Sequence, residues 1–304
     1  MTLRDEFREE VAKVVIGNEE AVDLLLVASI AGGHVLLEGP PGIAKTLLAG
    51  AIARSLGVKF TRIQFTPDTA PGELTGGEEL KMGERVFAPG AIFTNVLLAD
   101  EINRSPPRTQ AALLEAMQER HVTVDGRVHW LPSPFLVIAT QNPYEHEGVF
   151  ELPESQLDRF LFKIVLGYPT EEEELRMTRL PHRGVTPDMI EDVRPLLGAV
   201  ELERMQRELD ETTIPDEVRG YVVRVVRRTR ELPGVTLGAS PRAAIHLVAA
   251  AKANAWISGR TTVTIDDVGR IAPFVLAHRL IVEAGDPRDV VLAALELPAV
   301  ALPG

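Results

Sequence analysis

The sequence predicts an α/β fold with a mainly parallel, five-stranded sheet covered by helices, followed by a smaller all-helical domain. In the first half, five short apolar runs alternate with segments of helical periodicity, which is typical of parallel strands joined by helices. From Thr170 onward the pattern is helical with few strand signals. The sequence Gly-Tyr-Pro at 167–169 separates the two parts. We therefore predict one domain at 1–168 and a second at 169–304.

The elements of the first half can be assigned in order. Apolar runs give the strands, and the periodic segments between them give the helices, two of which end at glycine. The expected strands are 34–38, 59–65, 96–99, 135–140 and 161–166, and the expected helices are 19–31, 45–56 and 106–119. Ser105 is a natural N-cap for the last helix, with Pro106 at its first position.

Two hairpins are expected to interrupt the α/β part. Asp125-Gly126 lies at the centre of residues 121–130, with Val and Trp alternating around it, which indicates a tight two-residue turn. Residues 78–88 give a weaker signal, because Gly83 is the only turn residue there. The residues alone leave open whether the hairpins are solvent-facing decorations or contact a partner or substrate.

Capping signals mark helices in the second half. Thr170 with Glu173 has the spacing of a capping box, and so does Thr264 with Asp267, where Asp replaces the usual Glu. Ser240 is expected to cap a further helix, with proline following it at the first helical position. These signals support a helical second domain.

Composition excludes several classes of protein. The chain has 304 residues, no cysteine and a formal net charge of −12 at pH 7. Without cysteine there are no disulfides, thiolate zinc sites or cysteine nucleophiles. The acidic balance makes nucleic acid an unfavoured partner, and the apolar stretch at 24–31 is too short to span a bilayer. The charged N-terminus lacks a signal-peptide core, so we expect a cytoplasmic protein without a membrane span.

A glycine-containing loop between the first strand and the next helix predicts a phosphate site. Its residues are Gly39, Pro40, Pro41, Gly42, Ile43, Ala44, Lys45 and Thr46, with Leu47 continuing into the helix. Backbone N–H groups and the helix dipole would attract anionic oxygens, Lys45 would reach the β- and γ-phosphates, and Thr46 would ligate Mg²⁺. The usual pattern has glycine where this chain has Ala44, and the alternative is an ordinary strand-to-helix turn.

Polar residues at the ends of two later strands extend this prediction. Asp100 and Glu101 follow a buried strand, and Asn142 follows the next apolar strand. Because ligands gather at the carboxyl ends of parallel strands, we expect these residues near the phosphate loop. Asp100 would hold the metal, Glu101 would polarise the attacking water, and Asn142 would orient it. The alternatives are a capped turn for Asp-Glu and a simple Asn-Pro turn for Asn142.

Two arginines complete the candidate site. Arg242 is predicted in the first turn of a helix, where the dipole disfavours a cation, so an anionic partner would explain it. Arg159, in Leu-Asp-Arg-Phe, carries no such signal by itself.

Three blocks of the sequence resemble the signature of MoxR-family AAA+ ATPases. They are residues 98–117, the Ala-Thr-Gln-Asn-Pro at 139–143 and the run at 152–160. The resemblance extends from about Val14 to the C-terminus, and Ala44 is itself common in this family. It implies that the first domain is an AAA+ P-loop module and the second a helical lid, and that the chain hydrolyses ATP with Mg²⁺. Ile16 and Gly17 resemble the stretch that packs on adenine.

The resemblance also implies roles for individual residues. Asn142 matches sensor 1, Arg159 matches the arginine finger that acts on a neighbour's nucleotide, and Arg242 matches sensor 2, in cis or in trans. The polar residue that couples substrate to hydrolysis would be Gln64 or Thr66. The two hairpins resemble insertions that face the channel of a ring.

The expected function is therefore that of a homo-oligomeric, hexameric ATPase that remodels protein clients, with a von Willebrand factor A-domain partner, in complex assembly or metal-cofactor insertion. Three alternatives remain at this stage. The first is the motor subunit of a chelatase. The second is a DNA-remodelling ATPase, which would use Arg224, Arg227, Arg228 and Arg230. The third is a scaffold that is gated by nucleotide and hardly hydrolyses it.

Overall fold

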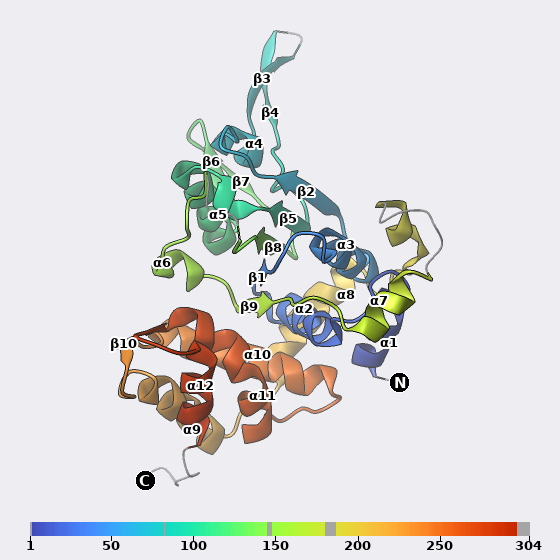
Figure 1. The fold of residues 1–304 in the computed structure, drawn as a ribbon. Helices are drawn as coiled ribbons and strands as arrows, with labels where there is room; N and C mark the ends of the chain where they lie inside the picture. Colours follow the sequence, from blue (N-terminus) through green and yellow to red (C-terminus); the bar gives the residue numbers. More distant parts are fainter. Residues whose placement is uncertain (1, 82, 145–147, 180–186, 297–304) are drawn as a thin grey trace.

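The structure is a computed structural model, and it describes residues 2–81, 83–144, 148–179 and 187–296. A five-stranded sheet forms its centre, with the strand order β2-β5-β8-β1-β9 (Figure 1). All neighbouring strands pair in parallel. The strands are β1 (Val35–Glu38), β2 (Phe60–Gln64), β5 (Val96–Asp100), β8 (Leu136–Gln141) and β9 (Phe162–Val165). Each of the five predicted strands is therefore present.

The central strands are buried on both faces, as expected for a parallel sheet between helices. Along β1, Val35 and Leu37 belong to one apolar cluster, whereas Leu36 belongs to a second cluster on the opposite face. The first cluster continues into α1 (Leu3–Val11), α2 (Glu19–Ala31) and α3 (Lys45–Ser55). The second continues into α4 (Pro71–Thr75) and α5 (Pro107–Glu119). This arrangement gives the three layers that the alternating sequence pattern predicts.

The N-cap predicted for α5 is wrong. The helix begins at Pro107, and its N-cap residue is Pro106. Ser105 precedes it, and its hydroxyl donates to the carbonyl oxygen of Ile102 at 2.7 Å. That bond completes the short 3-10 turn Ile102–Arg104, so the hydroxyl is used there instead of at the helix.

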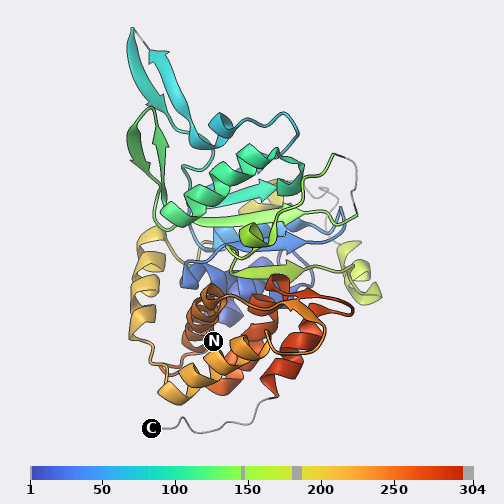
Figure 2. The same cartoon turned by 90° about the vertical axis from the view of Figure 1, so that its left-hand side faces the viewer.

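Both predicted hairpins are present and lie next to each other. One consists of β3 (Gly77–Lys81) and β4 (Glu84–Ala88), the other of β6 (His121–Val124) and β7 (Arg127–Trp130). Asp125 and Gly126 both have positive φ, as a tight two-residue turn requires. The rings of Phe87 and His129 stack with centroids 3.7 Å apart, so the hairpins contact each other where they extend from the domain (Figure 2).

The second half of the chain is helical, with one small addition. Its lid helices lie on the side of the sheet occupied by α2 (Figure 1). The elements after β9 are α7 (Glu171–Met177), α8 (Ala199–Glu208), α9 (Asp216–Arg228), α10 (Pro241–Ile257), α11 (Ile265–Leu276) and α12 (Pro287–Leu295), with 3-10 turns at Pro187–Asp192, Leu209–Glu211 and Ala277–Arg279. The addition is an antiparallel pair of β10 (Val235–Leu237) and β11 (Ile281–Val282). The capping residues Thr170, Ser240 and Thr264 are confirmed.

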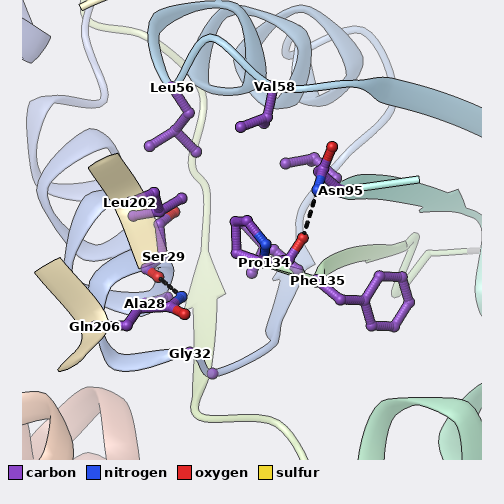
Figure 3. Close-up of a pocket in the computed structure, with 13 residues that line it drawn as sticks. Ala28, Ser29, Gly32, Leu56, Val58, Asn95, Pro134, Phe135, Leu202 and Gln206 are labelled. Atoms are coloured by element: carbon purple, nitrogen blue, oxygen red, sulfur yellow. Dashed lines mark hydrogen bonds between the residues drawn. The ribbon is translucent and has the colours of Figure 1, made fainter. Parts of the chain in front are cut away.

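Helix α8 lies against the α/β part, although it follows the predicted boundary at 168/169. Gln206 of α8 donates its side-chain amide to the carbonyl oxygen of Ser29 in α2 at 2.8 Å, beside a small crevice (Figure 3). On the other side of that crevice, Asn95 donates to the carbonyl oxygen of Pro134 at 2.9 Å (Figure 3). The boundary remains a prediction, and we propose that residues 187–208 connect the two domains while packing on the first.

Candidate nucleotide-binding site

The phosphate loop lies between β1 and α3, as the sequence predicts. Gly42 and Ala44 both have left-handed backbone conformations, with φ of 83° and 61°. A non-glycine residue in this conformation costs about 1 kcal/mol, which explains why glycine is the usual residue at the position of Ala44. The loop therefore has a backbone shape that favours glycine at two positions, one of which is occupied by Ala44.

Lys45 is directed back onto the loop that precedes it. Its Nζ donates to the carbonyl oxygen of Gly39 at 2.6 Å and lies 3.4 Å from those of Pro40 and Gln141. Gln141 is the last residue of β8, so the ammonium bridges the loop and a neighbouring strand. The cation is thus held at the place where the sequence analysis expects phosphates.

The carboxylates at the end of β5 lie beside this loop. Asp100 is 7% exposed, and its Oδ2 lies 3.4 Å from the hydroxyl of Thr46. The Thr140 hydroxyl donates to Asp100 Oδ1 at 2.6 Å and accepts from the backbone N–H of Glu101 at 2.9 Å. Glu101 has a positive φ of 57° and forms an ion pair with Arg104 at 3.2 Å. The two carboxylates therefore have different side-chain partners.

Arg62 on β2 gives this site a cation that the sequence analysis missed. Its Nε and Nη2 donate to Asp100 Oδ2 at 3.1 and 2.8 Å, and Nη2 also donates to Gln64 Oε1 at 2.7 Å. The Arg62 side chain is about half exposed, so the pair contributes at most about 1 kcal/mol to stability. Its chemical importance is that it occupies an oxygen of Asp100.

These groups line one large cavity of about 800 Å³, within the range of small-molecule sites. The predicted residues that line it are Pro41, Gly42, Ala44, Lys45, Thr46, Leu47, Asp100, Glu101 and Asn142, together with Gln64. Asn142 is 5% exposed, and its Oδ1 accepts from the backbone N–H of Tyr144 at 3.1 Å. We call this space the phosphate cavity.

The residues present fit a magnesium nucleotide. A Cβ added at Gly42 would meet no atom within 4 Å, so the loop has open space where phosphates would approach its backbone. The adjacent Thr46 hydroxyl and Asp100 carboxylate offer the oxygen ligands that Mg²⁺ prefers. The loop and the end of β5 therefore offer groups suited to phosphate and to Mg²⁺.

Seven predicted site residues do not line the phosphate cavity: Gly39, Pro40 and Ile43 of the loop, and Ile16, Gly17, Arg159 and Arg242. Gly17 lies beside α7, where an added Cβ would come within 2.4 Å of Glu173 Oε1, and Ile16 is buried. Arg159 and Arg242 line a separate cavity of about 220 Å³ between the end of α5 and α10. We call it the arginine cavity.

The arginine cavity is strongly basic. Arg120, Arg159 and Arg242 line it with His34 and His246, and no carboxylate is among its described lining residues. Burial lowers the pKa of His34 well below its usual value. Burial, followed by the proximity of Arg279, lowers the pKa of His246 to about 4. Both imidazoles are therefore neutral near pH 7, and the arginines supply the positive charge.

Other candidate sites receive less support. Among the described residues, no group of three or more His, Cys, Asp or Glu side chains could hold a metal ion. No described helix is long and apolar enough to cross a membrane. Of the arginines considered for DNA, Arg224 is partly buried and Arg230 donates to the carbonyl oxygen of Ala239. Arg227, Arg228 and Arg230 are exposed, so the basic face that they form lacks Arg224.

Comparison with known proteins supports the interpretation of the fold and the loop. Residues 34–162 match the ATPase family associated with various cellular activities (AAA), and residues 227–295 match the AAA lid domain. A crystal structure from Cytophaga hutchinsonii, described as a candidate ATPase, has a TM-score of 0.87 at 37% identity and covers 96% of this chain and 94% of its own. Fold and site thus define an AAA+ ATPase with a helical lid.

Relatives narrow the class further. Chaperone MoxR1 of Mycobacterium tuberculosis is 46% identical over 283 residues, covering 90% of this chain and 74% of its own. YeaC of Bacillus subtilis is also 46% identical, over 274 residues, with 90% and 85% covered. Protein MoxR of Methylorubrum extorquens is 34% identical, with 91% and 87% covered. The chain belongs to the MoxR family of AAA+ ATPases.

Proposed function

We propose that this ATPase is a ring-forming, chaperone-like motor whose active site is shared between adjacent subunits. The observation that carries the proposal is the position of Arg159 and Arg242 in the arginine cavity instead of the phosphate cavity. A basic cavity without lining carboxylates suits the polyphosphate of a neighbouring subunit. We therefore assign both arginines to action in trans.

The phosphate cavity would bind ATP and activate water. Lys45 and the loop N–H groups would bind phosphates, while Thr46 and Asp100 would hold Mg²⁺, which supplies charge neutralisation on the phosphate oxygens. Glu101 would accept a proton from the attacking water, and the buried Asn142 would orient that water. A neighbour's Arg159 would stabilise charge that develops on the transferred phosphoryl group.

Of the two candidates for coupling substrate to hydrolysis, we propose Gln64. Its side chain lines the phosphate cavity and accepts a hydrogen bond from Arg62. Thr66 instead uses its backbone N–H and its hydroxyl in contacts with the Thr69 hydroxyl.

The work of the motor would be the remodelling of protein clients. A relative named Chaperone MoxR1 supports this activity, and the family resemblance suggests a hexamer, a cytoplasmic location and a von Willebrand factor A-domain partner in complex assembly or metal-cofactor insertion. Exposed Leu80, Val86, Val128 and Trp130 on the paired hairpins offer apolar contacts for an unfolded segment.

A subunit-mixing experiment tests the shared site. Arg159→Ala alone should lose most ATP turnover, since removal of an arginine finger costs orders of magnitude in rate, while its own affinity for ATP remains. Mixing it with Lys45→Ala subunits, which cannot bind ATP but carry Arg159, should restore turnover. Arg228→Ala, an exposed lid substitution, is the matched control and should behave like wild type. Mixed oligomers that form but remain inactive would overturn the proposal.

A further inference from the structure

Arg279, a buried residue of the lid, contacts the segment that carries Arg159. Arg279 ends the 3-10 turn Ala277–Arg279, and its side chain is 1% exposed. Its Nη2 donates to the carbonyl oxygens of Asp158 at 3.2 Å and Phe160 at 2.6 Å. Because these residues flank Arg159, one guanidinium holds the backbone on both sides of it.

The side chain of Asp158 adds further lid contacts. Its Oδ1 accepts from Arg279 Nε at 2.8 Å, and both of its oxygens lie within 3.2 Å of the Ser240 hydroxyl at the start of α10. Arg242 Nη1 lies 3.7 Å from Asp158 Oδ2. Asp158 is therefore joined to two separate elements of the lid.

The buried guanidinium of Arg279 is fully paired with acceptors. A buried guanidinium is costly unless its donors are paired. Each nitrogen of Arg279 has an acceptor, since Nη1 also contacts the carbonyl oxygens of Leu161 and Val275, and Nη2 contacts Nδ1 of His246. Burial lowers the pKa of Arg279 to about 10 while Asp158 opposes the shift, so the group stays charged near pH 7.

The segment that carries Arg159 begins to pair with the sheet at Leu161. The Leu161 N–H donates to the carbonyl oxygen of His34, and from Phe162 onward the chain pairs with β1 in the sheet. Residues 158–160 receive hydrogen bonds from the lid as well as from the preceding turn, where the Arg159 N–H donates to the carbonyl oxygen of Gln156 at 3.1 Å. The Nε of Arg159 has no hydrogen-bond partner among the described residues. The Arg159 backbone is thus held from two sides, by its own turn in the α/β part and by Arg279 of the lid.

We propose that Arg279 is a positioning residue that couples the lid to the arginine finger, so that Arg159 reaches a neighbour's nucleotide only when the lid holds Asp158 and Phe160. This inference rests on the proposed action of Arg159 in trans. A purely structural role for Arg279 would lower stability or damage the phosphate cavity of its own subunit. A positioning role instead impairs the finger that the subunit donates and leaves its own site competent.

The test compares pairs of variants in mixed oligomers. Arg279→Gln alone should lose at least tenfold in turnover with unchanged ATP affinity, and mixing with Lys45→Ala should restore it, because Lys45→Ala donates intact fingers. Mixing Arg279→Gln with Arg159→Ala should not restore turnover, because both subunits donate defective fingers. Arg260→Gln, which breaks an ion pair with Asp267 within the lid, is the control and should keep wild-type turnover.

Each outcome separates the two proposals. If Arg159→Ala is restored by Lys45→Ala but Arg279→Gln is not, the positioning role is overturned while the shared site stands. Turnover in the Arg279→Gln and Arg159→Ala mixture would also overturn it. Failure of Arg159→Ala with Lys45→Ala would overturn the shared site and the inference with it. Should Arg279→Gln not fold, Arg279→Lys and Asp158→Asn replace it with the same expected pattern.

Discussion

The phosphate cavity and the arginine cavity differ in how their charged groups are held. In the phosphate cavity, Asp100 is held by Thr140 and Arg62, and Glu101 by Thr140 and Arg104, all from the α/β domain. Beside the arginine cavity, the Asp158 carboxylate next to Arg159 is held by Ser240 and Arg279 of the lid. The charged groups of the phosphate cavity are thus held within the α/β part, whereas those beside the arginine cavity are held by the lid, so lid movement would change the second more than the first.

The largest expected effect tests whether Glu101 acts on the nucleotide of its own subunit. Glu101→Gln should bind ATP but turn it over about 10²- to 10⁴-fold more slowly, because the water loses its proton acceptor. Steady-state hydrolysis and binding of labelled ATP measure the two properties. Glu115→Gln, an exposed position on α5, is the matched control. Mixing Glu101→Gln with Lys45→Ala should restore nothing, and restoration would contradict the contrast between the cavities.

A smaller effect concerns how the free energy of unfolding depends on pH through His246 in the arginine cavity. The pKa of His246 is lowered to about 4 by burial, then by Arg279 and Arg242, with Asp158 opposing. The unfolded chain therefore binds this proton more readily, and stability that is complete above about pH 6.5 is lost as pH falls toward 4. From pH 7 to pH 5 we expect a loss of about 1–2 kcal/mol from this group.

Urea unfolding at the two pH values measures this loss. His246→Gln should lose less stability than wild type between pH 7 and pH 5, whereas His121→Gln, on the exposed side of β6, should follow wild type. His34 and His278 have pKa values shifted in the same direction, but they titrate in every variant and cancel in the comparison. Equal losses for wild type and His246→Gln would contradict the assignment.

The smallest effect concerns metal binding in the phosphate cavity. Because Arg62 donates twice to Asp100 Oδ2, it competes with Mg²⁺ for that oxygen. Arg62→Gln should lower the Mg²⁺ concentration for half-maximal turnover about three- to tenfold, corresponding to a surface ion pair of about 1 kcal/mol. A magnesium titration measures it, with the hairpin variant Arg85→Gln as control. A higher magnesium requirement would show that Arg62 assists binding.

Local signals predicted much of the fold and of the phosphate cavity. Strands and helices of the first half follow apolar periodicity, and the loop at 39–46 is a contiguous motif. As the predicted N-cap, the Ser105 hydroxyl would accept from a backbone N–H of α5, whereas it donates to the carbonyl oxygen of Ile102 in the preceding turn. Such choices depend on backbone geometry that sequence spacing does not specify.

Contacts across the sheet and between domains were not predictable. Arg62 and Thr140 meet at Asp100 only because β2, β5 and β8 are neighbours in that order, although they are far apart in sequence. Arg279 lies 121 residues from Asp158 and carries no motif that points to it. A threonine at the end of a buried strand, directly before Gln141-Asn142, was the one available signal for Thr140.

The contacts of Lys45 have a consequence for the thermodynamics of nucleotide binding. Its ammonium already donates to backbone carbonyl oxygens of the loop and of β8, so the arrival of phosphate exchanges one set of acceptors for another. Because the ammonium must give up these carbonyl contacts, its net attraction for phosphate is smaller, which should moderate ATP affinity and favour release of the product after hydrolysis. The same contacts hold the loop in place before nucleotide binds, so this ATPase would not have to reorder its binding loop at each turnover.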